Sequence, residues 1–204
     1  MKNYRITCIL FFITFLSYSQ TFDQKIEDLI NENLDETIEL RHWFHQNAEL
    51  SNREFKTAAR IAEELKKIGY EPMTGIAKTG VVAILNPGKP GPVVGLRADI
   101  DALPVKERAD IPWASKMKGV YNGEEVPVMH ASGHDMHTAI LLAAAKILYD
   151  IKDEIPGQVK FIFQPAEEGA PPGEEGGAEL MVKEGVLKNP DVDAIFGLHV
   201  WSGL

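Results

Sequence analysis

The sequence predicts an α/β fold, in which helices pack in layers on a sheet with parallel crossovers. The first observation is a set of short apolar runs without polar alternation, which are typical of strands buried on both faces of a sheet. The second is the alternation of such runs with helical segments in the second half of the chain, which favours parallel crossovers. The apolar runs lie within residues 93–104, 159–169 and 194–201.

The remaining elements are predicted from apolar spacing and from glycine and proline positions. Residues 23–47 and about 54–68 have helical spacing, with Ser51 or Asn52 as the expected N-cap of the second helix. Two apolar runs around a proline- and glycine-rich turn predict a hairpin. Residues 105–130 are predicted to be loop with short strands. The later elements are expected in the following order: hairpin strands 80–85 and 92–96, helix 134–149, strand 159–163, short helix 178–184 and strand 194–200.

Residues 1–19 resemble a secretory signal peptide. Lys2 and Arg5 form a basic start, and an apolar run from 6 to 16 follows. A membrane span needs about 20 apolar residues, so this run predicts cleavage and no stable membrane anchor. We therefore expect a secreted or periplasmic protein with a mature region at residues 20–204. The single cysteine lies in the signal, which excludes thiolate ligands from the mature chain.

The 204-residue chain carries a net charge of −9, from 21 Lys and Arg against 30 Asp and Glu. An acidic balance argues against nucleic acid as a partner, because phosphate binding needs a basic face.

Ionisable side chains follow the ends of the predicted strands, where ligands bind in open α/β sheets. These side chains are Asp99, Asp101, Glu167, Glu168 and His199. Three histidines surround a Ser-Gly turn nearby, namely His130, His134 and His137. Carboxylates and imidazoles without sulfur suit Zn²⁺, Mn²⁺, Co²⁺ or Ni²⁺. The number of candidate ligands allows two divalent metals about 3.5–4 Å apart.

Each candidate also has a plainer explanation. Adjacent side chains alternate along an extended strand end, so one of Glu167 and Glu168 would bind metal while the other handles a proton; the alternative is a pair of surface acids. His134 and His137 share a helix face, and Asp135 suits the positive helix end as a cap.

Asp99 and Asp101 lie on one face of an extended segment, where one of them could orient a metal-bound histidine. The alternative is that they cap the turn before Pro104. His199 is either a ligand or the exposed end of its strand.

The motifs as a set resemble the aminoacylase/carboxypeptidase family of metal-dependent amidohydrolases. The closest likeness is to the branch with hippurate hydrolase, N-acetyl-amino-acid deacetylases and indole-acetyl-amino-acid hydrolases. In order, the motifs are LRHWFHQNAELSNREFKTA (40–58, with His45, Glu49 and Glu54), LRADIDALP (96–104), HASGHDMHTA (130–139), FQPAEEG (163–169) and GLHV (197–200).

The resemblance implies a zinc-peptidase-like catalytic domain with a mixed, mainly parallel sheet between helices. It also implies two divalent metals and N-acyl amino acids or short peptides as substrates. It implies Glu167 as the general base, with Asp101 beside it among the catalytic residues. The implied metal positions are Ser132, His134, Glu168 and His199. Groups expected beside the metals or the substrate are Asp99, Asp135, His137 and His130.

Three departures from the family stand out. Ser132 replaces a cysteine, and a hydroxyl is a poorer ligand than a thiolate. Ala48 replaces a proline. The sequence ends where the family has a lid and dimerisation domain, so we expect an incomplete catalytic domain and a homodimer for the full-length form.

Two alternatives to an active amidohydrolase follow from these departures. One is a degenerate protein that binds metal or an amino-acid ligand without turnover. The other is a fragment that aggregates or dimerises through an unpaired sheet edge.

Overall fold

The computed structural model describes the backbone of residues 3–201 and the side chains of residues 21–201. The chain divides into two compact units, residues 1–35 and 36–204. The first unit is the N-terminal part of helix α1 (Asn3–Gln46). The predicted signal peptide lies outside the part whose side chains are described, and it stays a prediction. Among the described residues, no helix is both long and apolar enough to cross a membrane.

The second unit is built on a five-stranded mixed sheet with the strand order β1-β2-β6-β3-β7. The strands are β1 (Met73–Ile76), β2 (Gly80–Leu85), β3 (Val93–Asp99), β6 (Gln158–Gln164) and β7 (Ala194–Gly197). β3 runs parallel to β6 and β7, whereas β2 runs antiparallel to β1 and β6. The mixed sheet is confirmed. A mainly parallel sheet was expected, but two of the four strand pairings are parallel and two are antiparallel.

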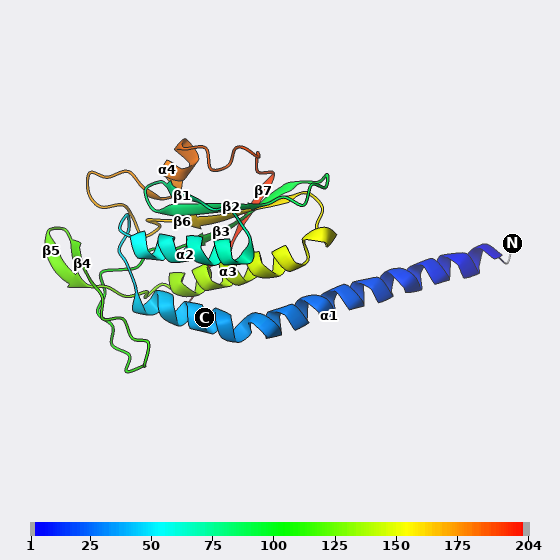
Figure 1. Cartoon of the computed structure of the whole chain (residues 1–204), viewed down its shortest axis with the longest axis horizontal. Helices are drawn as coiled ribbons and strands as arrows, with labels where there is room; N and C mark the ends of the chain where they lie inside the picture. The colour runs from blue at the N-terminus through cyan, green and yellow to red at the C-terminus, as the bar shows by residue number, and fades with distance from the viewer. Residues whose placement is uncertain (1–2, 202–204) are drawn as a thin grey trace. The chain divides into compact units, whose positions relative to one another are not determined.

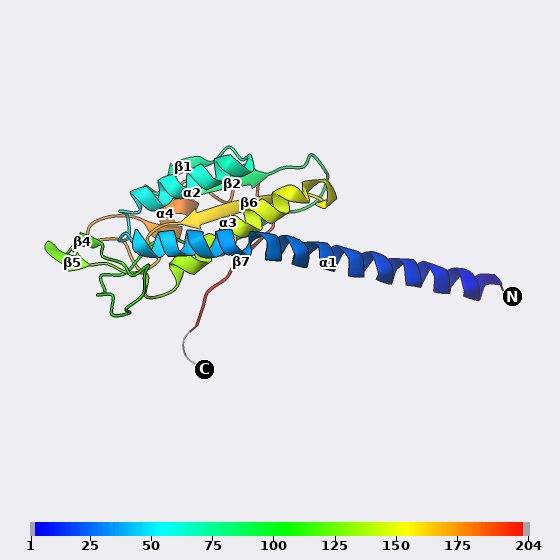
Figure 2. The same ribbon diagram turned by 60° about the horizontal axis from the view of Figure 1, so that its bottom comes forward.

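Helices cover both faces of this sheet (Figure 1). They are α2 (Phe55–Ile68), α3 (His134–Asp150) and α4 (Gly177–Lys183). The 3₁₀ turn η1 (Lys152–Glu154) follows α3. α2 and α3 lie side by side on one face (Figure 2), where Phe161 and Phe163 of β6 are fully buried in the larger core. On the opposite face, Met181 of α4 packs with Val82 and Ile162. A small separate hairpin consists of β4 (Lys118–Tyr121) and β5 (Glu124–Pro127).

The predicted hairpin of residues 80–85 and 92–96 is wrong, because β6 lies between the two strands. Lys160 of β6 is paired with Ile84 on one side and with Gly95 on the other. The β6 strand arrives by the crossover through α3, far along the chain. Apolar patterning marks a segment as a strand but carries no information about its neighbour.

The N-cap predicted for α2 is also wrong. Glu54 is the N-cap residue, and its side chain makes no capping hydrogen bond. The carboxylate of Glu49 instead accepts hydrogen bonds from the backbone N–H groups of Thr57 (2.9 Å) and Lys56 (3.2 Å). A carboxylate at this position satisfies free N–H groups and complements the positive helix end.

Strand β7 differs from the doubly buried strand expected from its apolar sequence. It lies at an edge of the described sheet, and all four of its residues are exposed, including Ile195 at 49% and Phe196 at 63%. An exposed apolar edge strand can pair with another chain. The self-association expected from the sequence therefore stays a prediction.

Candidate metal centre

Four segments bring the predicted site residues to one edge of the sheet. Asp99 ends β3, His134 and His137 open α3, and His199 follows β7. The turn after β6 adds Glu167 and Glu168 beside His134. The carboxyl ends of parallel strands meet at the same sheet edge, so the parallel run β6-β3-β7 explains this convergence.

His134 is the centre of the cluster. Its Nδ1 lies 2.8 Å from the backbone carbonyl oxygen of Asp101, which can only accept, so Nδ1 carries hydrogen. Its Nε2 is buried and has no hydrogen-bond partner among the described residues. That nitrogen lies 3.6 Å from an oxygen of Asp99 and 3.7 Å from oxygens of Glu167 and Glu168. A buried imidazole nitrogen facing three carboxylate oxygens beyond hydrogen-bond distance fits a divalent cation between them.

The same surroundings raise the pKa of His134. Burial lowers this pKa, but the hydrogen bond that His134 donates to Asp101 and the negative charges of Asp99 and Asp101 outweigh burial. A cation at Nε2 would replace the proton there, so metal binding should release a proton.

His137 holds Asp99 in place rather than offering a free lone pair. Its Nε2 accepts the backbone N–H of Val200 (3.0 Å), so its Nδ1–H donates to Asp99 (2.6 Å). Arg97 donates to the other Asp99 oxygen (2.7 Å). Burial alone would raise the pKa of Asp99, but the bond from His137 and the charges of His134 and Arg97 lower it. Asp99 is therefore an ionised, tightly oriented carboxylate.

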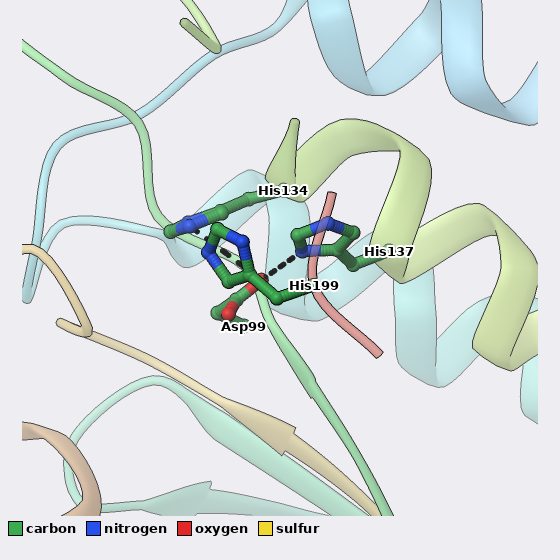
Figure 3. Close-up of side chains that lie close together, drawn as sticks. All are labelled: Asp99, His134, His137 and His199. Carbon is green, nitrogen blue, oxygen red and sulfur yellow. Dashed lines mark hydrogen bonds and ion pairs between the residues drawn. The ribbon is translucent and has the colours of Figure 1, made fainter. Parts of the chain in front are cut away.

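His199 approaches the cluster from the segment after β7 (Figure 3). It is exposed, and its Nδ1–H donates to the carbonyl oxygen of Val200 (2.7 Å), which leaves Nε2 open. Its ring centroid lies 5.6 Å from that of His134. Gly133 permits this approach, because a Cβ on its backbone (φ +92°) would lie 2.4 Å from the Val200 side chain.

Ligand atoms of these residues form two groups in which all atoms lie within 4.8 Å of one another. One group contains Asp99, His134, His137 and His199, and the other contains His134, Glu167 and Glu168. The two groups share His134, as expected for neighbouring metal positions.

The sequence suggested that the side chains of Glu167 and Glu168 alternate along a strand end, and this prediction is wrong. Both lie in a turn beyond the end of β6. The buried carboxylate of Asp101 accepts both of their backbone N–H groups, each at 3.0 Å. It also accepts the Ser51 hydroxyl at 2.7 Å. The turn therefore presents both glutamate side chains to His134.

Glu54 anchors the residue before this turn. One of its oxygens accepts the backbone N–H of Ala166 (2.8 Å), where φ is +49°, and the other accepts the Thr79 hydroxyl (2.6 Å). Glu54 is fully buried, and burial raises its pKa to about 7. Sequence reasoning noted Glu54 only as part of a motif, because nothing local distinguishes a buried glutamate from an exposed one at a helix start.

Ser132, which was expected at a metal position, donates its hydroxyl hydrogen to Glu168 (2.5 Å). It therefore lies beside the cluster, bonded to a candidate ligand.

Asp135 and His130 are not brought into the cluster. Asp135 faces α1, where it accepts from Arg41 (2.8 Å) and His45 (2.9 Å). His130 is buried, and neither ring nitrogen has a hydrogen-bond partner among the described residues. Burial lowers the pKa of His130 to about 4.

Comparison with known proteins agrees with this geometry. Residues 95–204 match the profile of Peptidase family M20/M25/M40. The chain belongs to this family. The resemblance inferred from the sequence motifs is therefore confirmed.

Two similar proteins have named activities. An N-acyl-L-amino acid amidohydrolase of Geobacillus stearothermophilus is 42% identical over 181 residues, which are 89% of this chain and 45% of that protein. A hippurate hydrolase of Campylobacter jejuni is 43% identical over 175 residues, which are 84% of this chain and 42% of that protein.

The solved structure of the Bacillus subtilis YXEP protein, described as a dinuclear metal-binding peptidase of the M20 family, is 39% identical. It matches with a TM-score of 0.71 over 82% of this chain and 43% of that one. The chain thus spans less than half the length of these relatives.

Proposed function

We propose that this protein is a metal-dependent amidohydrolase that cleaves the amide bond of N-acyl amino acids or short peptides. The observation that carries the proposal is the buried Nε2 of His134, which faces three carboxylate oxygens without a hydrogen-bond partner. The relatives named for N-acyl-amino-acid and hippurate hydrolysis support this substrate class.

His134, Glu168 and His199 are the proposed metal ligands, with Ser132 at the edge of the same set. Imidazole and carboxylate ligands suit Zn²⁺, Mn²⁺, Co²⁺ or Ni²⁺, and the two groups that share His134 favour two ions per site. Such ions, when bound, polarise an amide carbonyl and lower the pKa of water.

Glu167 is the proposed general base. Its side chain is 35% exposed, so water can reach the carboxylate beside the cluster. Glu167 would take a proton from the attacking water and return it to the amide nitrogen as the C–N bond breaks. The products are a carboxylic acid and a free amino acid.

We assign Asp101 a positioning role within this mechanism. Its two carboxylate oxygens already accept from the backbone N–H groups of Glu167 and Glu168 and from the Ser51 hydroxyl. It therefore acts on the reaction through the turn that carries the general base.

The cellular setting belongs to the same proposal. Removal of residues 1–19 would yield a secreted or periplasmic enzyme, and the full-length form would be a homodimer. The net charge of −9 argues against nucleic acid as a partner.

The direct test is to measure metal content and hydrolysis side by side on purified residues 20–204. The substrates are N-acetyl- and N-benzoyl-amino acids. We expect bound divalent metal, with hydrolysis that disappears on chelation and returns on adding metal. A protein that binds no divalent metal would contradict the proposal.

A further inference from the structure

The segment that leaves the Glu167–Glu168 turn and leads to α4 is rich in glycine and proline. It has the sequence GAPPGEEG and spans residues 169–176, which we call the strap. Its first residue, Gly169, lines two cavities, one of about 520 Å³ that contains Glu168 and one of about 550 Å³ that contains Glu167. A movement of the strap would therefore change the surroundings of both glutamates.

The backbone of the strap is bonded only to its immediate neighbours. Among the described residues, the backbone–backbone hydrogen bonds of the strap reach no further than Ala166 and Leu180. A segment held only by such local bonds opens easily. The attachment of the strap to distant parts of the fold therefore depends on side chains.

The side chain of Glu174 makes this long-range attachment. One oxygen accepts from Arg53 (2.5 Å), and the other accepts from Arg53 (3.1 Å), Asn52 (3.1 Å) and Lys78 (2.6 Å). Arg53 and Asn52 precede α2, and Lys78 lies in the turn between β1 and β2. The bonds from Arg53, Lys78 and Asn52 lower the pKa of Glu174, so its carboxylate stays ionised. Charge-assisted bonds to an ionised group are stronger than neutral ones.

Two of the three partner residues have an unusual backbone. Asn52 has φ of 60° and Lys78 has φ of 80°, a region that side chains other than glycine seldom adopt. Asn52 is also buried, and it donates a second bond to the carbonyl oxygen of Glu175 (3.1 Å). A strained backbone persists where the surrounding structure fixes it, often beside a functional site. The partners of Glu174 are therefore held in place before the strap reaches them.

The next residue in the strap, Glu175, has a different partner. Its carboxylate pairs with Lys183 of α4 at 2.5 Å, and the two side chains are 68% and 54% exposed. This pair joins the strap to the helix that follows it directly. The carboxylate of Glu174, in contrast, joins the strap to loops about 100 residues or more away in the sequence.

We propose that Glu174 is a positioning residue, which fixes the strap and thereby holds the Glu167–Glu168 turn beside His134. Asp101 and Glu54 hold the backbone N–H groups at the turn and just before it, whereas Glu174 holds the chain that leaves it. The proposal rests on the proposed function and adds a group that keeps the same site assembled.

The first test measures backbone amide hydrogen exchange by NMR in the full chain without metal. We expect the amides of Glu167 and Glu168 to exchange at least about tenfold faster in Glu174→Gln, because the loss of charge-assisted bonds lets the strap open. Glu175→Gln is the matched control, one residue away and of the same chemistry. It should exchange at the native rate.

The second test measures Zn²⁺ affinity by competition with a chelator. We expect Glu174→Gln to weaken binding about tenfold, within the range for residues that orient metal ligands. The difference from the native chain should shrink in about 1 M NaCl, where the Debye length is about 3 Å. A loss of packing alone would not depend on salt. Arg53→Gln should weaken binding in the same way, and the double variant should be no weaker than Glu174→Gln alone.

Native exchange at Glu167 and Glu168 in Glu174→Gln would overturn the proposal, and so would equal effects of Glu174→Gln and Glu175→Gln. Faster exchange with unchanged Zn²⁺ affinity would also overturn it, because the strap would then open without disturbing the site. A native chain that binds no Zn²⁺ would contradict the proposed function. Exchange at the two glutamate amides would then decide the positioning role by itself.

Discussion

Two pairs of carboxylates meet at this sheet edge in different environments. The side chains of Asp99 and Asp101 are 0% exposed, and every carboxylate oxygen of that pair accepts a hydrogen bond. The side chains of Glu167 and Glu168 are 35% and 24% exposed. In that pair the backbone is anchored, and the carboxylates face His134.

This difference in burial and hydrogen bonding suits the two pairs of carboxylates to different roles. Burial would raise the pKa of Asp101, but its hydrogen bonds from His134 and Ser51 outweigh burial and lower this pKa. A buried, ionised and fully bonded carboxylate is rigid and suited to orienting neighbours. A carboxylate with open oxygens at the solvent boundary can bind a cation or exchange a proton. The aspartates are therefore suited to holding their neighbours in place, and the glutamates are the groups proposed to bind metal and transfer the proton.

Replacing Glu167, the proposed general base, should give the largest effect. We expect Glu167→Gln to reduce kcat about 10³-fold, because an amide cannot accept the proton of water. Metal content and thermal unfolding should stay unchanged, since the backbone anchors of the turn remain. Steady-state kinetics and metal analysis check this. The control is Glu179→Gln, an exposed site on α4. Normal hydrolysis by Glu167→Gln would refute its assigned role.

Glu54 is a third kind of carboxylate at this site. It is buried, it accepts the backbone N–H of Ala166 before the glutamate turn, and burial raises its pKa to about 7. The folded state keeps this proton up to about pH 7, whereas the unfolded chain releases it near pH 4.5. The free energy of unfolding should therefore fall by about 3 kcal/mol as the pH rises across that interval. Urea unfolding at several pH values measures the slope.

Glu54→Gln should remove this slope while retaining an acceptor for the N–H of Ala166. The exposed Glu71→Gln should leave the slope as it is. An unchanged slope in Glu54→Gln would show that another group carries the proton.

Asp101→Asn tests the buried pair directly. The amide group turns one acceptor into a donor that faces a backbone N–H of the turn. We expect a loss of about 2 kcal/mol in stability and at least about a tenfold loss in kcat. Urea unfolding and kinetics check both, with the exposed Asp153→Asn as control. Lower stability with full activity would show that the turn holds its position without Asp101.

Ser132→Cys should have the smallest effect of the four. The Ser132 hydroxyl donates to Glu168, and a thiolate at this position would bind metal itself. We expect metal affinity to rise about tenfold, within the range for changes around metal ligands. Competition with a chelator measures it, with Ser115→Cys as a control away from the cluster. No change would place Ser132 outside the ligand set.

Much of the fold was predictable from the sequence, because its signals are local. The 3.6-residue apolar period located α2, and the glycine turn before His134 located the start of α3. Strand ends with ionisable residues predicted the convergence of Asp99, His134 and the glutamate pair. Short strands were expected within residues 105–130, but their pairing through an Asn122–Gly123 turn was missed, although this dipeptide is a recognised turn signal.

Tertiary structure alone decided the features that depend on distant partners. The Glu167–Glu168 turn is anchored by Asp101, 66 residues earlier, and the preceding Ala166 by Glu54, 112 residues earlier. The position of β6 between β2 and β3, and the exposure of β7, likewise depend on which strands meet. The sequence determined the chemistry available to this protein, because residue type and local spacing set it. Packing decided which carboxylates became anchors and which stayed free, because burial and hydrogen bonding exist only in the folded chain.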